Sequence, residues 1–400
     1  MKKRIKFLFS LCLVSFALFI FYFNTQLYYQ PKIGFIYNNP VNHSIIEQLK
    51  FLKNEIHHDA ADKMQGLFPE GFIFYNVIYG LTWCELASKL NTQSKLYKEA
   101  KTEIDWAFSE VNSAKGREIF DENLPLHYGA FYNGWTTLLL GKKLSIQNER
   151  QKEEIELFNL KCQQIADAFS KNSSPYLESY SNGIWQADNV ICMASLALHD
   201  KLFTPKYDKI ISEWVQKVKA QLDPKTGLIG HSGNEKSPRG SSQSLINVFL
   251  PDIDSVFAKE VFKKYRNNFL ENRLGLTLIR EYPKGTEGKG DIDSGPVIWD
   301  IGGVASIVGI KAMAVNKDYS SAKTLRNNIE ALTLPLTINN QKRYFLGLFS
   351  MADIFIAWSN ITYFNERDIE NSNNMFLIHA LSLLLILTIA ALHYKTILKT

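Results

Sequence analysis

Two kinds of helical segment alternate along most of this chain, and that alternation is the strongest constraint on its fold. Apolar residues recur every three or four positions, as they do in helices. One kind of segment is charged along one face, which is typical of a helix with a solvated side; these segments are 44–56, 97–113, 152–172, 205–222, 255–274 and 318–332. The other kind is poor in charge and rich in Gly, Ala and aromatic residues, as buried helices are; these segments are 71–90, 126–144, 184–202, 241–250, 296–316 and 346–359.

The charge-poor segments start at intervals of about 55 residues, which predicts a repeated helical hairpin. Six inner and six outer helices close most naturally into an all-α (α/α)6 toroid of six αα-hairpins. In such a ring every inner helix begins at the same end, so the loops that lead into the inner helices, here called the leading loops, meet over a common cleft. The positive ends of the helix dipoles converge there as well.

Apolar runs at both ends of the chain predict two membrane-spanning helices. Residues 7–23 are apolar apart from two serines and follow a cluster of Lys and Arg, and residues 375–392 form a second run that is followed by Lys395. Each run is long enough to cross a bilayer, although a buried core helix is the alternative for the second. Because positive residues mark the cytoplasmic side, we expect both termini in the cytoplasm and the domain between them outside the cell (inner) membrane. The predicted parts are an uncleaved anchor at 1–24, an extracytoplasmic toroid at 25–373, and a transmembrane helix with a short tail at 374–400.

Composition, charge and cysteine usage exclude several classes of protein and partner. With 46% hydrophobic and 21% charged residues, the chain is neither disordered nor collagen-like nor a coiled coil. No long basic run follows the first six positions, so we expect no nucleic-acid partner. Cys84, Cys162 and Cys192 lie in the outward domain; one disulfide with one free thiol fits them, but the sequence does not decide the pairing. No zinc-type spacing is present, and we expect no metal and no cofactor.

The leading loops carry polar and aromatic residues that predict a carbohydrate site. Sugars stack their apolar faces on aromatic rings while their hydroxyls bond to carboxylates and amides, and glycoside cleavage needs a protonated acid and a second carboxylate. Our candidates for catalysis are Asp188, Asp293, Asp291, Glu70 and His127. Our candidates for substrate binding are Trp185, Asn189, Tyr128, Tyr132, His231, Arg239, Glu281 and Cys192.

The candidates also have structural interpretations. Asp188 and Asp293 stand before apolar helical runs, where aspartate often caps a helix. Glu70 fits a plain turn between a proline and a glycine. His127 and His231 fit hydrogen-bonded structural histidines as well as acid–base groups.

Short motifs around these candidates resemble the linalool dehydratase/isomerase-like family. They are His127-Tyr128-Gly129 with the Leu-Leu-Leu-Gly run at 138–141, Asp188-Asn189 with Cys192 and the run at 196–202, and Arg280-Glu281 with the Gly-rich acidic loop behind it. The resemblance implies an (α/α)6 barrel whose pocket holds a terpene alcohol among cysteines, a histidine, a tyrosine and acidic residues. Cys192 matches one of those cysteines and His127 loosely matches the histidine, whereas Trp185-Gln186-Ala187 stands where the family carries another cysteine. The architecture is also similar to six-hairpin glycosidases, uronate lyases and sugar epimerases.

Three functions follow from these interpretations. The first is a membrane-anchored, extracytoplasmic enzyme that hydrolyses a glycan, with Asp188 acting across the cleft from Asp291 and Asp293. The second is a lyase or isomerase of a small apolar alcohol, with Cys192 and His127 as its acid–base groups. The third is a non-catalytic protein that binds a glycan or a partner protein. A deep, dry pocket with Cys192 at its base favours the second function, and an open groove with Trp185 and carboxylates favours the first.

Overall fold

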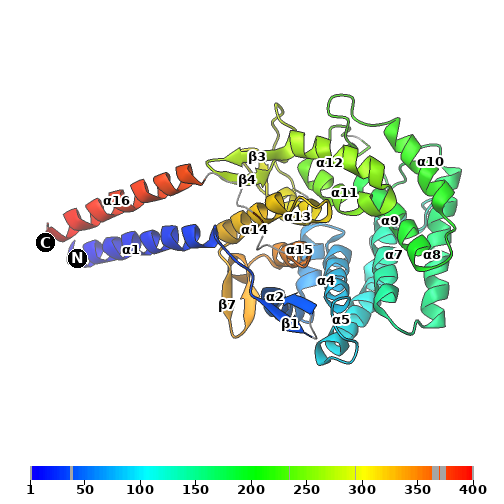
Figure 1. Ribbon diagram of the computed structural model, residues 1–400, viewed down its shortest axis with the longest axis horizontal. Helices are drawn as coiled ribbons and strands as arrows, with labels where there is room; N and C mark the ends of the chain where they lie inside the picture. Colours follow the sequence, from blue (N-terminus) through cyan, green and yellow to red (C-terminus); the bar gives the residue numbers. More distant parts are fainter. Residues whose placement is uncertain are drawn as a thin grey trace.

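The structure of the chain, a computed structural model, describes residues 2–36, 39–233, 235–292, 294–362, 369 and 375–398. It consists of a rounded, mostly helical domain from which two long helices extend together on one side (Figure 1). The prediction of a helical protein with an apolar helix at each end is confirmed.

The charge-poor segments form helices that pack against one another in a closed circuit. These inner helices are α4 (Gly71–Ala87), α7 (Gly129–Ile146), α9 (Gln186–Leu202), α11 (Gly240–Ile253), α13 (Gly303–Val315) and α15 (Ser350–Asn360). Each inner helix contacts the next one in this order, and α15 contacts α4. Figure 1 shows them around one centre.

The charged segments form a second layer outside this circuit. These outer helices are α2 (His43–Ile56), α5 (Lys95–Val111), α8 (Lys152–Lys171), α10 (Asp208–Lys219), α12 (Ser255–Phe269) and α14 (Tyr319–Thr333). In the order of the inner helices from α4, the partners are α5, α8, α10, α12 and α14, and α2 packs against α15. Each outer helix buries one stripe: in α10 the buried residues Ile211, Trp214, Val215 and Val218 recur every three or four positions.

Aromatic side chains fill the space between the inner helices. The Phe74 ring of α4 lies 5.1 Å from the Phe131 ring of α7 and 5.5 Å from the Phe355 ring of α15, measured between centroids. The Phe249 ring of α11 lies 5.8 Å from the Trp135 ring of α7. Large rings from four inner helices therefore meet in the centre, where their burial supplies much of the hydrophobic driving force for the domain.

The two layers begin their helices differently. Several outer helices start at a side chain that accepts a backbone N–H: Asn42 caps α2, Ser94 caps α5, Asp254 caps α12 and Asp318 caps α14. In the described chain, no inner helix begins with such a side-chain cap. The first N–H groups of several inner helices bond to neighbouring loops instead.

Short antiparallel hairpins and short helices connect the layers, and the sequence did not reveal the strands. The pairs are β1 (Ile33–Ile36) with β2 (Asn39–Asn42), β3 (Leu270–Arg273) with β4 (Leu276–Ile279), β5 (Val297–Ile298) with β6 (Ile301–Gly302), and β7 (Leu336–Ile338) with β8 (Gln341–Arg343). The remaining short elements are α3 (Ala60–Leu67), α6 (Ala114–Arg117) and η1 (Phe345–Gly347). The segments expected as helix at 255–274 and 296–316 are each partly strand, because two to four residues are too few to show a strand period.

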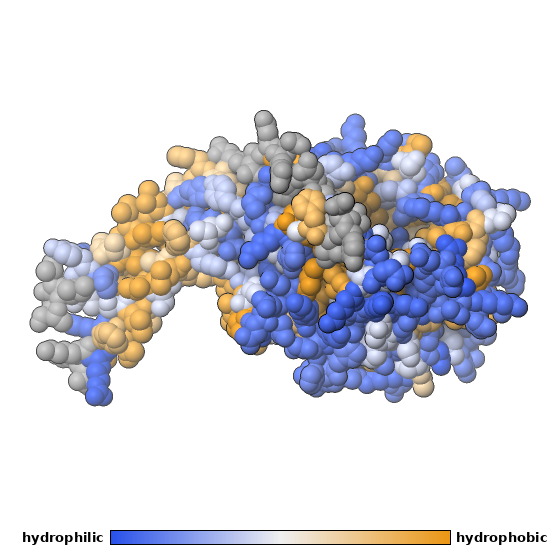
Figure 2. All heavy atoms as spheres, turned by 60° about the horizontal axis from the view of Figure 1, so that its bottom comes forward, coloured by the Kyte–Doolittle hydropathy of each residue, from blue (hydrophilic) through white to orange (hydrophobic). Residues whose placement is uncertain are grey.

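The terminal helices α1 (Lys2–Gln26) and α16 (Phe376–Leu398) lie side by side. Both are long and apolar enough to cross a membrane, by length and composition, and Figure 2 shows them as a hydrophobic arm beside a mostly hydrophilic domain. Polar pairs join them: the Asn24 amide donates to Ser382 Oγ at 2.9 Å, and Ser10 Oγ lies 2.8 Å from His393 Nδ1. The end of α1 is fixed to the domain, since Leu27 is buried and its carbonyl accepts a bond from Asn327.

Candidate functional site

The leading loops of neighbouring inner helices touch one another around much of the ring. The Ala130 N–H of α7 donates to the Glu178 carbonyl, which belongs to the loop that leads into α9. The Gln186 N–H of α9 donates to the His231 carbonyl in the loop before α11, and the Gly240 N–H of α11 donates to the Glu281 carbonyl in the loop before α13. Residues that are far apart in sequence are thus neighbours at one end of the inner helices, as the periodicity predicted.

Two glycines permit this close contact between loops. A side chain at Gly129 would collide with the Ser179 carbonyl, and Gly129 also has a φ of +79°. A side chain at Gly240 would collide with the Arg280 carbonyl. Glycine is therefore required at the first position of both α7 and α11.

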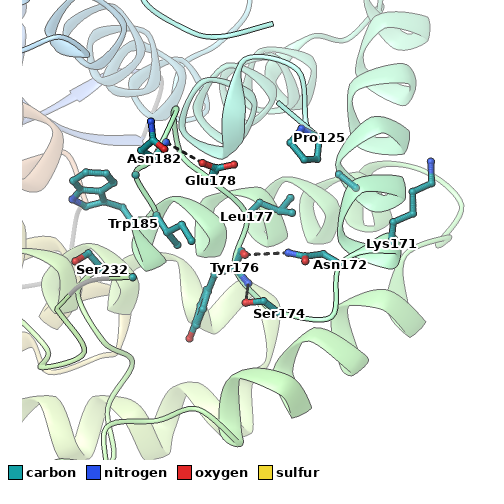
Figure 3. Close-up of a pocket in the computed structure, with 14 residues that line it drawn as sticks. Pro125, Lys171, Asn172, Ser174, Tyr176, Leu177, Glu178, Asn182, Trp185 and Ser232 are labelled. Carbon is teal, nitrogen blue, oxygen red and sulfur yellow. Dashed lines mark hydrogen bonds between the residues drawn. The ribbon is translucent and has the colours of Figure 1, made fainter. Parts of the chain in front are cut away.

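A pocket of about 680 Å3 opens beside the third leading loop (Figure 3). The end of α8, the loop before α9 and the loop before α11 form its walls. Its lining residues are Pro125, Ala168, Lys171, Asn172, Ser174, Tyr176, Leu177, Glu178, Asn182, Gly183, Ile184, Trp185, Ser232 and Gly233. The pocket has the size of a small-ligand site and combines aromatic, amide, hydroxyl and carboxylate groups.

Asn189 holds the loop that forms this pocket. Its side chain is fully buried; it accepts a hydrogen bond from the Leu177 N–H at 2.7 Å and donates to the Leu177 carbonyl at 3.1 Å and the Trp185 carbonyl at 2.9 Å. The Trp185 N–H in turn donates to Ser179 Oγ. Asn189 was predicted to bind substrate, but its polar groups are used to position the pocket.

Trp185 and Glu178 supply the polar and aromatic groups of the pocket. The half-buried Trp185 ring packs on the Tyr180 ring with centroids 4.7 Å apart. Glu178 accepts a hydrogen bond from the Asn182 N–H at 2.9 Å, and Figure 3 shows its carboxylate on the pocket side of the loop. The Tyr176 hydroxyl is buried and has no hydrogen-bond partner among the described residues.

A buried arginine forms the second part of the site, next to the pocket through His231 and Ser232. Arg239 donates from Nε to Glu281 Oε1 at 2.9 Å and from Nη2 to Asp291 Oδ1 at 3.0 Å, while Nη1 bonds to Asp291 and lies 3.5 Å from His231 Nε2. We call these four residues the arginine cluster. Ser241, in the first turn of α11, donates to Glu281 from both its hydroxyl and its backbone N–H.

Burial and charge set the protonation of the arginine cluster. Burial raises the pKa of Glu281 to about 7, although the bonds from Ser241 and Arg239 oppose this shift. Burial and the Arg239 charge lower the pKa of His231 to about 4. Burial opposes ionisation of Asp291, but hydrogen bonds from Arg239 and the Ser294 N–H lower its pKa to about 2. Asp291, which is about half exposed, is therefore the ionised and accessible carboxylate of the cluster.

His231 and Glu281, the other titratable members of the arginine cluster, hold neighbouring groups in place. An Arg239 N–H faces His231 Nε2, so the neutral imidazole carries its proton on Nδ1 and donates it to Ser242 Oγ at 2.5 Å. His231 is thus not placed to take a proton from Ser242. Glu281 is completely buried and both of its oxygens accept hydrogen bonds, so it positions Arg239 and the start of α11.

The remaining predicted residues lie in several places. Asp188 is buried in the first turn of α9, where Trp185 and not Asp188 is the cap residue. Cys192 is completely buried and does not line the pocket; its thiol donates to the Ala130 carbonyl, and burial raises its pKa. Glu70 is the partly exposed residue before α4. Asp293 lies outside the described residues.

Three further candidates come from the second leading loop. His127 is exposed, and its carbonyl accepts a bond from the Asn133 amide. Tyr128 precedes α7 with a φ of +68°. Tyr132 is buried and its hydroxyl donates to the Val111 carbonyl at 3.0 Å, which makes it a packing residue.

Sequence analysis missed Glu178, Tyr176 and Ser232. The third leading loop was interpreted only from residue 183 onward, although 176–183 carries two tyrosines, a glutamate and an Asn-Gly pair. That cluster was the signal that could have found the pocket.

Comparisons with known proteins do not narrow the chemistry. No protein-family model matches the chain, and no curated protein matches it significantly.

All four cysteines are unpaired, which decides the pairing that the sequence left open. Among the described residues, no group of three or more His, Cys, Asp or Glu side chains is placed to hold a metal ion.

Proposed function

We propose that the domain is an (α/α)6 toroid held at the outer face of the cell (inner) membrane by α1 and α16, with both termini in the cytoplasm. The closed circuit of inner helices, each with an outer partner, supports the toroid. The same architecture is what the resemblance to linalool dehydratase/isomerase-like proteins implies. The length and apolar composition of the terminal helices support the anchor, and Lys and Arg at the cytoplasmic ends support the orientation.

The toroid binds a glycan in the pocket beside Trp185. The observation that carries this proposal is the lining of the pocket: it contains a tryptophan, a carboxylate, amides and hydroxyls, whereas Cys192 is buried elsewhere in the helix packing. Aromatic rings with polar groups around them suit sugar rings and their hydroxyls. A terpene alcohol would need an apolar pocket with the thiol exposed in it.

The reaction proposed is hydrolysis of a glycosidic bond. Water supplies a proton and a hydroxide equivalent; one carboxyl group protonates the leaving oxygen, and a second carboxylate accepts a proton from water or attacks the sugar. Asp291 has the ionised state that a base or nucleophile needs. Asp188, Glu70 and Asp293 remain the predicted partners.

A glycan array with the full-length chain in lipid nanodiscs tests the binding. Glu178→Gln and Trp185→Ala should abolish retention of the bound glycan, and Glu156→Gln, an exposed glutamate on α8 outside the pocket, should leave it unchanged. Binding that survives both pocket variants, or no binding to any glycan by the parent chain, would refute the proposed ligand.

Reducing-end release from the glycan that binds tests the reaction. Asp291→Asn should lose turnover while binding persists, because the base is removed and the pocket is intact. A glycan that binds without any product would show that the protein is the non-catalytic glycan-binding alternative. Thermal unfolding of every variant separates these outcomes from misfolding.

A further inference from the structure

Two hairpins lie at the edge of the domain from which α1 and α16 extend. In Figure 1 the β3–β4 hairpin lies on one side of this pair of helices and the hairpin that begins with β7 lies on the other. Both are attached to α14, because β4 packs against α14 and β7 follows it directly. The Asn328 amide of α14 donates to the Thr277 carbonyl of β4 at 2.7 Å.

The position of the β7–β8 hairpin relative to α1 is fixed by several contacts. The Tyr22 hydroxyl of α1 donates to the Pro335 carbonyl at 2.5 Å, immediately before β7. On β8, Lys342 Nζ lies 4.6 Å from the centroid of the Tyr29 ring and 2.8 Å from Glu330 Oε1, and all three groups are buried or nearly so. The ion pair fixes the hairpin to α14, and the hairpin cannot move away from the end of α1 without breaking the Tyr22 hydrogen bond and the contact of Lys342 with the Tyr29 ring.

Apolar side chains on these elements are exposed. Leu336 and Ile338 are 40% and 45% exposed, and as positions i and i+2 of one strand they share a face of the hairpin. Leu332, at the end of α14, is 44% exposed, and Leu274, at the turn between β3 and β4, is 40% exposed. We call these four residues the apolar collar. Leu274 has a φ of +55°, a conformation that favours Asn or Gly in a turn that faces water.

We propose that the apolar collar rests in the outer leaflet of the bilayer that α1 and α16 cross. The collar adjoins α1 at Leu336, because Tyr22 lies in the last turns of that helix and contacts Pro335, the residue before Leu336. A bilayer whose surface lies at Tyr22 therefore reaches the first residue of β7. The inference rests on the anchoring proposed above, and it adds that the domain is held against the membrane surface and not tethered at a distance.

Fluorescence quenching by nitroxide lipids tests the collar in the full-length chain. Cys12 lies exposed on α1, whereas Cys84, Cys162 and Cys192 are buried, so an environment-sensitive thiol dye labels the parent chain at Cys12. Labels at Ile338→Cys and Leu274→Cys, each combined with Cys12→Ser, report on the collar. Leu160→Cys with Cys12→Ser is the control, since Leu160 is a 54% exposed leucine on α8, which lies at the far side of the domain.

In nanodiscs that hold a single copy, we expect head-group and shallow acyl-chain nitroxides to quench the dyes at Ile338 and Leu274 strongly, and aqueous iodide to quench them several-fold less than the dye at Leu160. Quenching at Cys12 with none at either collar position would overturn the inference and leave the anchoring intact. Cys12 lies ten residues, or about 15 Å along the helix, from Tyr22, so its dye is read with nitroxides placed deep in the acyl chains. A dye at Cys12 that these deep nitroxides do not quench would refute the anchoring itself. Protection that appears only when discs hold two copies would overturn the inference and identify the collar as an interface between copies.

Discussion

Replacing His231 with glutamine should remove a large pH-dependent contribution to the stability of the domain. The His231 side chain is buried next to the Arg239 guanidinium, and these surroundings lower its pKa from 6.5 to about 4. Between these two pH values the unfolded chain binds a proton that the folded chain does not, so the free energy of unfolding falls as the pH falls. A difference of about 2.5 pKa units corresponds to about 3 kcal/mol.

Urea unfolding of the full chain in detergent micelles at pH 7 and pH 4 measures the contribution of His231 to the free energy of unfolding. The loss of unfolding free energy over that range should be about 3 kcal/mol smaller in His231→Gln than in the parent chain. Glu281 titrates with the opposite sign because its pKa is raised, but it is present in both proteins, so the difference isolates His231. His58→Gln, at an exposed histidine outside the cluster, is the control and should follow the parent chain. Equal pH dependence in the parent and His231→Gln would refute the inference that His231 is held neutral beside Arg239.

Three further outcomes follow from burial and hydrogen bonding. Asn189→Ala leaves the Leu177 backbone groups without their partner and should cost about 2–4 kcal/mol in urea unfolding, while glycan retention on the array falls; a stable variant with full binding would contradict the role of Asn189 in positioning the pocket. Asp254→Ala removes the cap of α12 and should cost about 1 kcal/mol with glycan retention unchanged. A maleimide added to the native chain should modify Cys12 alone, as intact mass will show, and modification of Cys192 before unfolding would contradict its complete burial.

The helices could be predicted because each layer has a distinct charge pattern. The outer helices bury one stripe, and the inner helices bury nearly every side, as in α13. The two kinds of helix therefore differ in how charged and apolar residues are distributed along the sequence. The hairpins could not be predicted in this way. In β5–β6, the apolar Val297, Ile298 and Ile301 continue the pattern of the helix that follows them, while Trp299 and Asp300 adopt positive φ values that only the folded surroundings impose.

The sequence could predict which residues of the candidate site lie near one another, but it could not predict what each residue does there. Periodicity placed His231, Arg239, Glu281 and Asp291 near one another, and the structure joins them through the Arg239 guanidinium. Periodicity could not show that Glu281 is completely buried while Asp291 is about half exposed, because that difference depends on how the fifth leading loop folds over the start of α11. The protonation of each group follows from this burial.

The hydrogen bonds that join successive leading loops also shape the site. The first N–H groups of α7, α9 and α11 lack side-chain caps and donate instead to the loop that leads into the next inner helix. A change in one leading loop therefore removes the cap of the preceding helix and displaces the neighbouring part of the site. Activity lost on replacing a residue such as Asp188 or Glu281 consequently has two physical causes, and only variants with unchanged unfolding free energy assign a residue to the chemistry.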